Sequence, residues 1–485
     1  MAASAGSAAA WRPSGNCSRW KGCCPSPCSE PGRPPGPARS RTGTGWHTAP
    51  VTPLPEPPGA GPEAPDAAAL PALRRRITTV LIASQMLGGL ANATGIALAA
   101  VLAAETSGSQ ALSGLASAAM VAGPALLAMP LAALMTRRGR RPGLVLAYLL
   151  GAAGAVVVVT GAVLASFPLL LSGMAVFGAG SLGNLQARYA AADLAEPARR
   201  ARAISTVVWA TTIGAVLGPN IAAPAGHSVT RFGIPAAAGP FVWAAGVFLL
   251  SAALVGVLLR PDPLLTARAL DGSAAHSATA RSLRAGVRAV RQSPRARLAL
   301  VTVAVSHTAM VSIMSMTPVA LTRHGADIQL IGLVISVHIA GMYAFSPVMG
   351  WLADRLGRLS VIGLAAGLLC CAALLAGTAG TSHGQTMAGL FLLGLGWSAG
   401  LVSGSALLTD SVPGPARAAV QGLCDLTMNV AAGLGGLTAG LIVARAGYGW
   451  LNAAGASLLL PMAGLALFTS RRHGRRETPR TTATD

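Results

Sequence analysis

Three ionisable side chains stand inside long apolar stretches, and their chemistry is that of proton exchange. Asp425 lies about two helical turns inside one stretch, and His307 and His338 lie near the centres of two others. A carboxyl group in hydrocarbon has to be protonated, paired with a cation, or turned to a water-filled cavity. Asp425 is therefore the preferred candidate for a proton or cation site, with both histidines as further candidates. Each histidine has a second interpretation, a neutral imidazole bonded to one backbone carbonyl.

The short loops between apolar stretches carry a second set of chemically active residues, and these recur. Residues 350–358 read G-W-L-A-D-R-L-G-R, and a related loop at 132–141 reads A-A-L-M-T-R-R-G-R-R, 218 positions earlier. An aspartate followed seven residues later by an arginine recurs at an offset of 217, first as Asp193 and Arg200, then as Asp410 and Arg417. Two landmarks that share nearly one offset predict a chain built from two similar halves.

The later loop has the residue types of a latch at the end of a helix. Gly350 lets its helix approach a neighbour closely, and Gly357 permits a tight turn. Asp354 would meet the positive N-terminal dipole of a neighbouring helix. Arg358 can pair with Asp410 or with Asp354.

The earlier loop departs from this pattern at two positions. Ala132 stands where the later copy has a glycine, and Thr136 stands where it has an aspartate. The acidic partner of this half is therefore open, with Asp193 as a substitute partner for Arg137 or Arg140.

Apolar stretches long enough to cross a bilayer, about 20 residues each, follow one another from residue 77. We place twelve of them near 77–103, 110–135, 143–165, 168–192, 203–225, 237–259, 297–320, 328–352, 359–380, 385–409, 418–444 and 447–470. Loops after odd-numbered stretches hold only Arg231, Arg323 and Arg445, while loops after even-numbered ones are rich in arginine. The positive-inside bias therefore places both termini and the long central loop in the cytoplasm. The predicted fold class is all-α, a polytopic membrane protein with twelve transmembrane helices in two six-helix repeats.

Composition agrees with the membrane class. The chain of 485 residues is 53% hydrophobic and only 11% charged, whereas soluble domains carry about 25% charged residues. The net charge of +21 does not indicate nucleic acid, because the arginines are spread over loops and form no single patch. The seven cysteines show no paired metal-ligand spacing, so we expect free thiols, no metal and no cofactor.

These patterns divide the chain into five segments. We expect a disordered cytoplasmic tail at 1–72, a six-helix bundle at 73–260, a cytoplasmic linker at 261–296, a second bundle at 297–470 and a cytoplasmic tail at 471–485. An alternative for the first segment is that the true start lies downstream. In the linker, arginines at 281, 284, 288 and 291 recur at helical spacing, which suits either a helix on the inner leaflet or a solvated basic linker.

The G-x-x-x-D-R-x-G-R loop, the twelve stretches and the long central loop resemble the major facilitator superfamily over nearly everything after the tail. The resemblance implies a binding cavity between the halves and a cytoplasmic gate that breaks as the halves rock. The gate residues it implies are Gly350, Asp354, Arg355, Gly357, Arg358, Arg137, Gly139, Arg140, Asp193, Arg200, Asp410 and Arg417.

The fifth stretch contains Gly214, Gly218 and Pro219 as G-x-x-x-G-P, which resembles the signature of the proton-coupled efflux subgroup, although the double glycine that usually follows is absent. A tight helix crossing is the alternative interpretation. Efflux relatives carry an arginine in the fourth stretch where this chain has Met174. We do not transfer that coupling role to Arg188, which lies nearer the end of the stretch.

Other polar and aromatic residues of the stretches are candidates for the lining of the substrate cavity: Gln85, Asn92, Asn184, Trp209, Tyr343 and Trp397. A mostly neutral lining favours an amphiphilic or lipophilic solute over a sugar or a phosphate.

The function predicted is secondary active transport, with proton-coupled efflux of small amphiphilic or drug-like molecules by a monomer in the bacterial inner membrane. The partners are a small-molecule substrate, the proton and the lipid bilayer. One alternative is a proton-coupled importer or facilitator of a metabolite, and another is a non-transporting receptor or assembly protein on the same fold. No P-loop, nucleophile elbow or H-E-x-x-H occurs, so an enzyme is not predicted.

Overall fold

Long helices joined by short turns make up the described part of the chain. The computed structural model describes residues 68–108, 112–270, 283–326 and 328–466, and no strand occurs within these ranges. Most of the predicted first tail and all of the predicted last tail lie outside the described residues.

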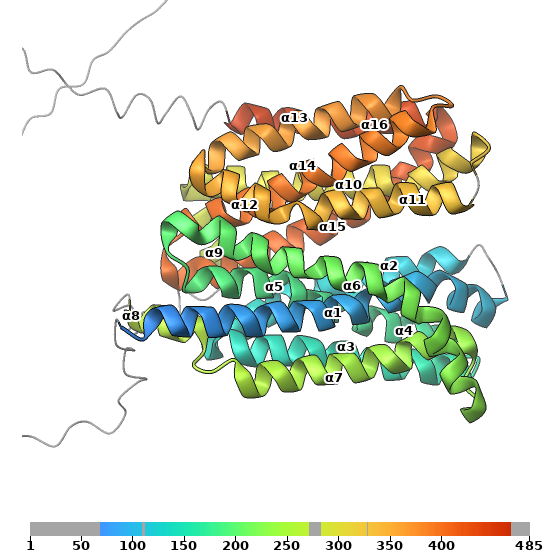
Figure 1. The fold of residues 1–485 in the computed structure, drawn as a ribbon, viewed down its shortest axis with the longest axis horizontal. Coiled ribbons are helices and arrows are strands. Elements are labelled where there is room, and N and C mark those ends of the chain that lie inside the picture. Colours follow the sequence, from blue (N-terminus) through green and yellow to red (C-terminus); the bar gives the residue numbers. More distant parts are fainter. Residues whose placement is uncertain (1–67, 109–111, 271–282, 327, 467–485) are drawn as a thin grey trace, which may run out of the picture. The chain divides into compact units, whose positions relative to one another are not determined.

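The described residues of the first half form seven α-helices before the linker, with one predicted span divided in two. They are α1 (Leu70–Ser107), α2 (Ser113–Arg138), α3 (Arg140–Val163), α4 (Phe167–Gly178), α5 (Gly180–Asp193), α6 (Arg200–Val229) and α7 (Gly239–Leu258). Short 3-10 turns precede α6 and α7 and follow α6: η2 (Pro197–Arg199), η3 (Thr230–Phe232) and η4 (Ala236–Ala238). Figure 1 shows this half in blue to green.

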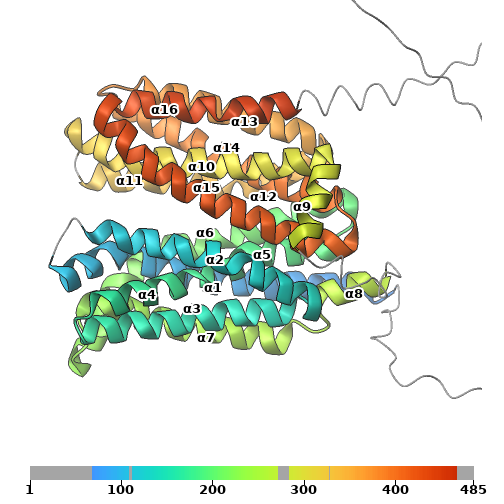
Figure 2. The ribbon, with the colours of Figure 1, turned by 180° about the vertical axis from the view of Figure 1, so that it is seen from behind.

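The second half repeats the arrangement with its own irregularities. Its helices are α10 (Pro294–Arg323), α11 (Ile328–Ile339), α12 (Ser346–Arg355), α13 (Arg358–Gly377), α14 (His383–Asp410), α15 (Arg417–Ala446) and α16 (Tyr448–Ser457). A π-helical turn, η6 (Ala340–Ala344), joins α11 to α12, and a 3-10 turn, η7 (Gly414–Ala416), precedes α15. Figure 2 shows both halves from behind.

Eleven helical segments of the described residues are long and apolar enough to cross a membrane. α1, with 38 residues, is a further long helix that packs along α6 and α7. The chain is therefore an all-α multi-pass membrane protein, as predicted, and its helix number is consistent with the expected twelve. The long apolar runs explain why these segments are helical. In hydrocarbon, backbone N–H and C=O groups have no water to bond, so they bond to one another within a helix.

Two turns show the duplication directly. Gly139 lies between α2 and α3 with φ 94°, and Gly357 precedes α13, two residues after the end of α12, with φ 90°. Only glycine adopts these angles without strain. The same offset of 218 that relates the two loops in sequence therefore relates two turns of one geometry.

The linker between the halves holds two short helices, α8 (Pro263–Leu270) and α9 (Leu283–Gln292). α8 packs on α3 and α5 of the first half, and α9 packs on α10 and α15 of the second. Figure 1 shows both at the left, on the side where α1 begins. We call this side, which also holds the turns at Gly139 and Gly357, the linker end.

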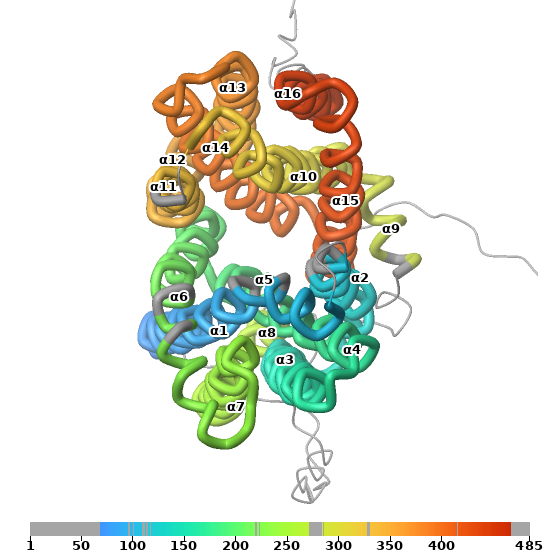
Figure 3. The backbone as a smooth tube through the Cα atoms, turned by 90° about the vertical axis from the view of Figure 1, so that its right-hand side faces the viewer, coloured from blue at the N-terminus to red at the C-terminus, as the bar shows by residue number. Residues whose placement is uncertain are grey.

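The two halves share part of their packing. Of the two larger apolar cores, one is drawn from the first half, and the other combines the second half with Ala192, Ala201, Ile204 and Val208 of the first. Across the halves, α2 packs on α15 and α6 packs on α12, and Figure 3 shows these two neighbouring pairs from the end of the helices.

Irregularities of three kinds interrupt the described helices: a break, a π-helical turn, and prolines inside α2 (Pro124 and Pro130) and α10 (Pro318). The fourth span breaks at Ala179, between α4 and α5. The eighth span contains the π-helical turn η6, while the second span carries Pro124 inside α2. Periodicity of apolar residues does not predict such breaks, since all three leave the span apolar.

Candidate functional site

The arginine that follows each repeated glycine pairs with the repeated aspartate of its own half. Arg140 Nε lies 2.7 Å from Asp193 Oδ2, and Arg358 Nε lies 3.3 Å from Asp410 Oδ2. The first pair is buried, whereas Asp410 is partly exposed. The halves therefore keep one ion pair at equivalent positions, and Asp193 is the partner of Arg140.

Asp354 fastens the end of α12 to the start of α6 in the other half. Its carboxylate accepts the backbone N–H groups of Ala201 at 3.1 Å and Arg202 at 2.9 Å. It also pairs with Arg358 at 2.7 Å. A carboxylate at the N-terminus of a helix satisfies N–H groups that have no helical partner and meets the positive end of the dipole.

Further contacts strengthen this side of the linker end. Arg200 pairs with Asp410, and Arg358 Nη2 donates to the Pro197 carbonyl at 2.6 Å. Gly350 lies against Ser205, where an added Cβ would come within 2.6 Å of the serine Cβ. Gly350 thus serves the α6–α12 contact, while the Arg200–Asp410 pair joins α6 to α14.

Three other predicted gate residues also lie at the linker end. Arg137 is exposed. Arg355 stacks on Trp351, with its guanidinium carbon 5.1 Å from the ring centroid. Arg417 Nε donates to the Val412 carbonyl at 3.2 Å.

A buried polar network runs through the α5–α15 contact. Gln186 is its centre, because its Oε1 accepts from Arg140 Nη1 at 2.8 Å while its Nε2 donates to Asp425 Oδ2 at 2.7 Å. Arg188 Nη2 lies 2.8 Å from Asp425 Oδ1. Gln186 therefore links the ion pair Arg140–Asp193 to the ion pair Arg188–Asp425.

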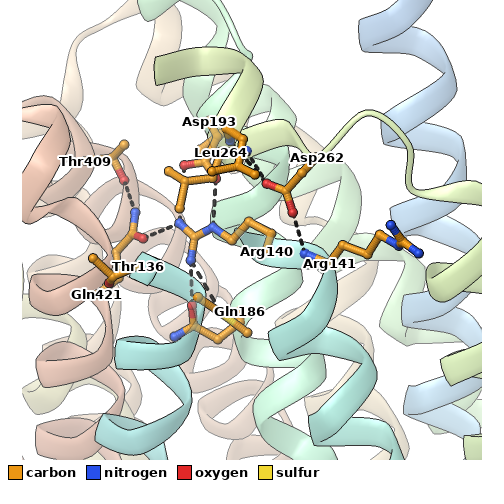
Figure 4. Close-up of polar contacts among 12 residues, drawn as sticks. Thr136, Arg140, Arg141, Gln186, Asp193, Asp262, Leu264, Thr409 and Gln421 are labelled. Carbon is orange, nitrogen blue, oxygen red and sulfur yellow. Dashed lines mark hydrogen bonds and ion pairs between the residues drawn. The ribbon is translucent and has the colours of Figure 1, made fainter. Parts of the chain in front are cut away.

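A second bridge ties this network to the other half (Figure 4). Arg140 Nη2 donates to Gln421 Oε1 at 2.5 Å, and Gln421 Nε2 donates to Thr409 Oγ1 at 3.2 Å. We call Arg140, Gln186, Arg188, Asp193, Gln421 and Asp425 the buried network.

The Arg188–Asp425 pair has little contact with solvent. The side chains are 2% and 0% exposed, and Arg188 has one further bond, from Nη2 to the Tyr189 hydroxyl at 3.2 Å. Arg188 Nε is buried without a hydrogen-bond partner. In such surroundings the two charges depend on each other, since either alone would lack compensation.

Two of the predicted cavity residues lie together with one predicted coupling residue in the second half. Trp397 Nε1 donates to His307 Nδ1 at 2.9 Å, and Tyr343 meets the Trp397 ring edge to face at 5.4 Å between centroids. Because Nδ1 accepts, the neutral His307 ring carries its proton on Nε2. The three side chains form an aromatic cluster from α10, η6 and α14.

His338 lies apart from this cluster. Its contacts agree in part with the interpretation as a neutral imidazole bonded to one backbone carbonyl. It is fully buried, and its Nδ1 contacts the Leu390 carbonyl at 2.8 Å. Its Nε2 is buried without a hydrogen-bond partner.

The remaining cavity candidates either bond within the first half, although Gln85 Oε1 is buried without a hydrogen-bond partner, or are partly exposed. Gln85 Nε2 donates to Thr211 at 2.7 Å, and Asn92 Nδ2 donates to the Gly88 carbonyl at 3.0 Å. Asn184 accepts from Tyr148 at 3.1 Å. Trp209 is 38% exposed.

The glycines of the fifth span form a close helix crossing with α1. A Cβ at Gly214 would come 3.0 Å from Cα of Gly89, and one at Gly218 would come 2.5 Å from Cβ of Ala93. Pro219 lies one residue further along α6. The spacing that predicted close packing of small residues is thus used against α1.

Sequence reasoning missed several members of the buried network. Gln421 and Thr409 carried no motif signal, and Arg188 was not assigned a partner in the second half. The one usable signal was the free-energy cost of burying a charge in an apolar span. A single Arg in one span and a single Asp in another are expected to pair, because pairing lowers that cost.

A multi-pass membrane protein of two six-helix halves, joined at one end by buried ion pairs, is the class that fold and site define. The model described as Major Facilitator Superfamily matches residues 80–327 and 299–484. The chain belongs to this family of membrane transporters.

Two relatives extend the match along most of the chain. It is 37% identical over 389 residues to the uncharacterized MFS-type transporter YdeG of Bacillus subtilis (strain 168), covering 80% of this chain and 90% of that protein. It is 31% identical over 395 residues to the riboflavin transporter RfnT of Brucella anthropi, covering 81% and 94%.

Solved structures agree in fold. The human organic anion transporter MFSD10 matches with a TM-score of 0.63 at 19% identity, covering 81% of this chain and 99% of that one. FucP in the outward conformation matches with a TM-score of 0.65 at 15% identity, covering 80% and 98%.

Proposed function

We propose that the protein is a proton-coupled exporter of small amphiphilic molecules, held here with its cytoplasmic side closed. The observation that carries this proposal is the buried Arg188–Asp425 pair, 2.8 Å long and joined to both halves through Gln186. Scaffolding alone gives no reason to bury two charges in a membrane-spanning bundle, since apolar packing of the same volume is as stable or more so.

The linker end is assigned to the cytoplasm on its charge. The arginines of both repeated loops and of the linker gather there, in agreement with the positive-inside bias. By this assignment both termini are cytoplasmic and the membrane is the bacterial plasma membrane, the location that the two bacterial relatives suggest.

The closed state follows from where the halves are bonded. Hydrogen bonds between described residues of the two halves include Asp354 to the start of α6, Arg358 to Pro197, and Ser346 Oγ to the Ser205 carbonyl at 2.7 Å. These, with the buried network, all lie toward the linker end. Alternating access requires that they break together when the other side closes.

Proton coupling follows from the chemistry of Asp425. A proton reaching its carboxylate from the non-linker side neutralises the charge that compensates Arg188. The ion pair and the Gln186 bridge both weaken, so the halves separate at the linker end. The proton is then released to the cytoplasm, and renewed pairing closes the gate around the captured substrate.

The direction of transport is proposed from the fifth span. Gly214 and Gly218 hold α6 tightly against α1, in the G-x-x-x-G-P segment that resembles the proton-coupled efflux subgroup. A crossing without room for water keeps protons from leaking between these helices.

A second candidate function is import of riboflavin or a similar planar heterocycle. The 31% identity to RfnT favours it, and the aromatic cluster of His307, Tyr343 and Trp397 offers ring edges and faces suited to a flat solute.

One assay separates the candidates. Purified protein in liposomes is given a pH gradient, with ethidium placed on the side opposite to the acid and riboflavin, in separate liposomes, placed on the acidic side, and the movement of each probe is followed by fluorescence. Export predicts gradient-driven ethidium movement against the proton flow. Riboflavin movement with the proton flow supports the second candidate, and no movement of a proton with either probe contradicts proton coupling.

A further inference from the structure

The two repeated turns have one geometry but different acidic anchors. Asp354 is the anchor in the second half, as described above. Thr136 occupies the equivalent position of the first half and turns its hydroxyl back to the Ala132 carbonyl of its own helix, at 2.7 Å. The hydroxyl thus bonds within its own helix, and this position offers the neighbouring half no carboxylate, although the backbone of its turn is similar.

A carboxylate nevertheless lies on the first turn, and it comes from the linker (Figure 4). Asp262 Oδ2 accepts the backbone N–H of Arg141 at 2.7 Å. A Cβ added to Gly139 would come within 2.5 Å of the carboxyl carbon, so only glycine fits there. At the equivalent Gly357, no atom lies within 4 Å of such a Cβ.

The other oxygen of Asp262 begins the linker helix. Oδ1 accepts the backbone N–H groups of Leu264 at 3.0 Å and Leu265 at 3.2 Å, as a capping side chain does. One carboxylate therefore caps α8 and α3 at once, through separate oxygens.

Two further bonds fasten the same corner. Arg141 Nε donates to the Gly256 carbonyl of α7 at 2.8 Å, and Arg268 of α8 donates to the Thr136 carbonyl at 2.8 Å. Each bond joins helices of the first half or its linker, and none reaches the second half.

We infer that Asp262 is a positioning residue of the gate: it fixes the start of α3 so that Arg140 reaches across to Gln421. Arg140 precedes the residue that Asp262 holds, and its guanidinium meets Asp193, Gln186 and Gln421 at once. Three acceptors at fixed places need a fixed backbone beneath the guanidinium. The inference rests on the proposed alternating-access function.

The gate is therefore built unequally. Asp354 bonds across the halves, so its bonds to α6 break at every opening. Asp262 bonds within its own half, so its bonds persist while Arg140 and Gln421 separate. The linker thus supplies the acid that Thr136 does not.

The native thiol of Cys424 reports on the gate. It is 1% exposed, lies next to Asp425 on α15, and contacts Tyr189 of the other half. Separation of the halves uncovers it, while Cys370 and Cys371 lie on the outer surface of the membrane-spanning helix α13, away from the gate, and serve as internal controls whose rates should not change.

The test compares Asp262→Asn, Asp262→Ser and Asp354→Asn in the full chain, in lipid nanodiscs. Alkylation of each thiol by N-ethylmaleimide is timed by peptide mass spectrometry, and unfolding is followed by heat. Asn and Ser keep an oxygen to cap α8 but remove the charged acceptor of Arg141. A charge-assisted bond corresponds to about tenfold or more in an equilibrium constant.

Since Asp262 acts through Arg140, we expect Cys424 to be alkylated about three- to tenfold faster in both Asp262 variants. We expect a larger increase in Asp354→Asn, with unchanged rates at Cys370 and Cys371. If the alkylation rate of Cys424 increases in Asp354→Asn alone, the proposed role of Asp262 is wrong, while the proposed gate remains supported. Unchanged Cys424 in all three variants overturns the proposed gate as well.

Discussion

The substitution Asp425→Asn tests the proposed coupling site most directly. Asparagine has nearly the shape of aspartate and retains an oxygen for Gln186 or Arg188, so the helices need not repack. It removes the charge that compensates Arg188, whose side chain is 2% exposed. The change therefore isolates the electrostatic part of the pair.

The size of the effect follows from the burial of the pair. Loss of one member of a buried ion pair costs about 3–5 kcal/mol, because the remaining guanidinium keeps its desolvation cost. This cost falls on the closed state, in which Arg188 is shut away from water. We expect the equilibrium between closed and open linker ends to move by roughly a hundred- to a few-thousand-fold toward opening.

Two measurements check this expectation. Gradient-driven transport in liposomes should be abolished in Asp425→Asn, while expression and solute exchange without a gradient remain. Alkylation of Cys424, whose thiol is 1% exposed in the closed state, should become faster than in the wild-type protein.

The double variant Arg188→Gln with Asp425→Asn is the control. It removes both charges, so the closed state should regain most of its stability, yet proton-driven transport should stay absent. Transport under an imposed pH gradient that equals wild type in Asp425→Asn would refute the assignment of Asp425.

Two further predictions concern packing and connection at the linker end. Gly350→Leu should lower transport about tenfold or more by pushing α12 away from Ser205. Gly363→Leu is its control, because no atom lies within 4 Å of an added Cβ there, and it should transport normally. Flux in liposomes checks both variants, and equal flux would contradict the close contact. Gln186→Leu should uncouple the two buried ion pairs and reduce gradient-driven flux about ten- to a hundredfold by leaving charged groups short of a bond. Gln385→Leu removes bonds within the second half alone and is the matched control, so similar losses in both variants would show general destabilisation.

The spans were predictable because their signal is local. Each apolar stretch carries its own length, and the loops carry arginine, so twelve helices in two halves follow without knowledge of any contact. The glycines at 139 and 357 were likewise predictable, since a tight turn between two helices needs a residue that tolerates positive φ.

The partners of the charged residues were less predictable. Arg358 was expected to meet Asp354 or Asp410 and meets both. Arg188 was set aside because it lies low in its span, but its partner stands on α15, far away in sequence. Which face of one helix meets which face of another depends on rotation and tilt, and apolar periodicity fixes neither when a span is apolar all round.

Asp262 illustrates the same limit from the linker. No motif marks it, because its role depends on how the end of α7 passes the turn at Gly139. A comparison of the two loops shows that an acid is missing at Thr136, but it does not show which segment provides the replacement.

The duplicated halves also differ inside their second helices. Pro124 of α2 lacks an N–H donor, and 218 positions later Met342 lies within the π-helical turn η6. Main-chain hydrogen bonding is therefore irregular at equivalent positions of the two halves. The cause is a proline in the first half and a π-helical turn in the second. A helix that lacks or displaces a main-chain bond bends more easily there, so the second helix of each half has a point of lower stiffness at the corresponding position.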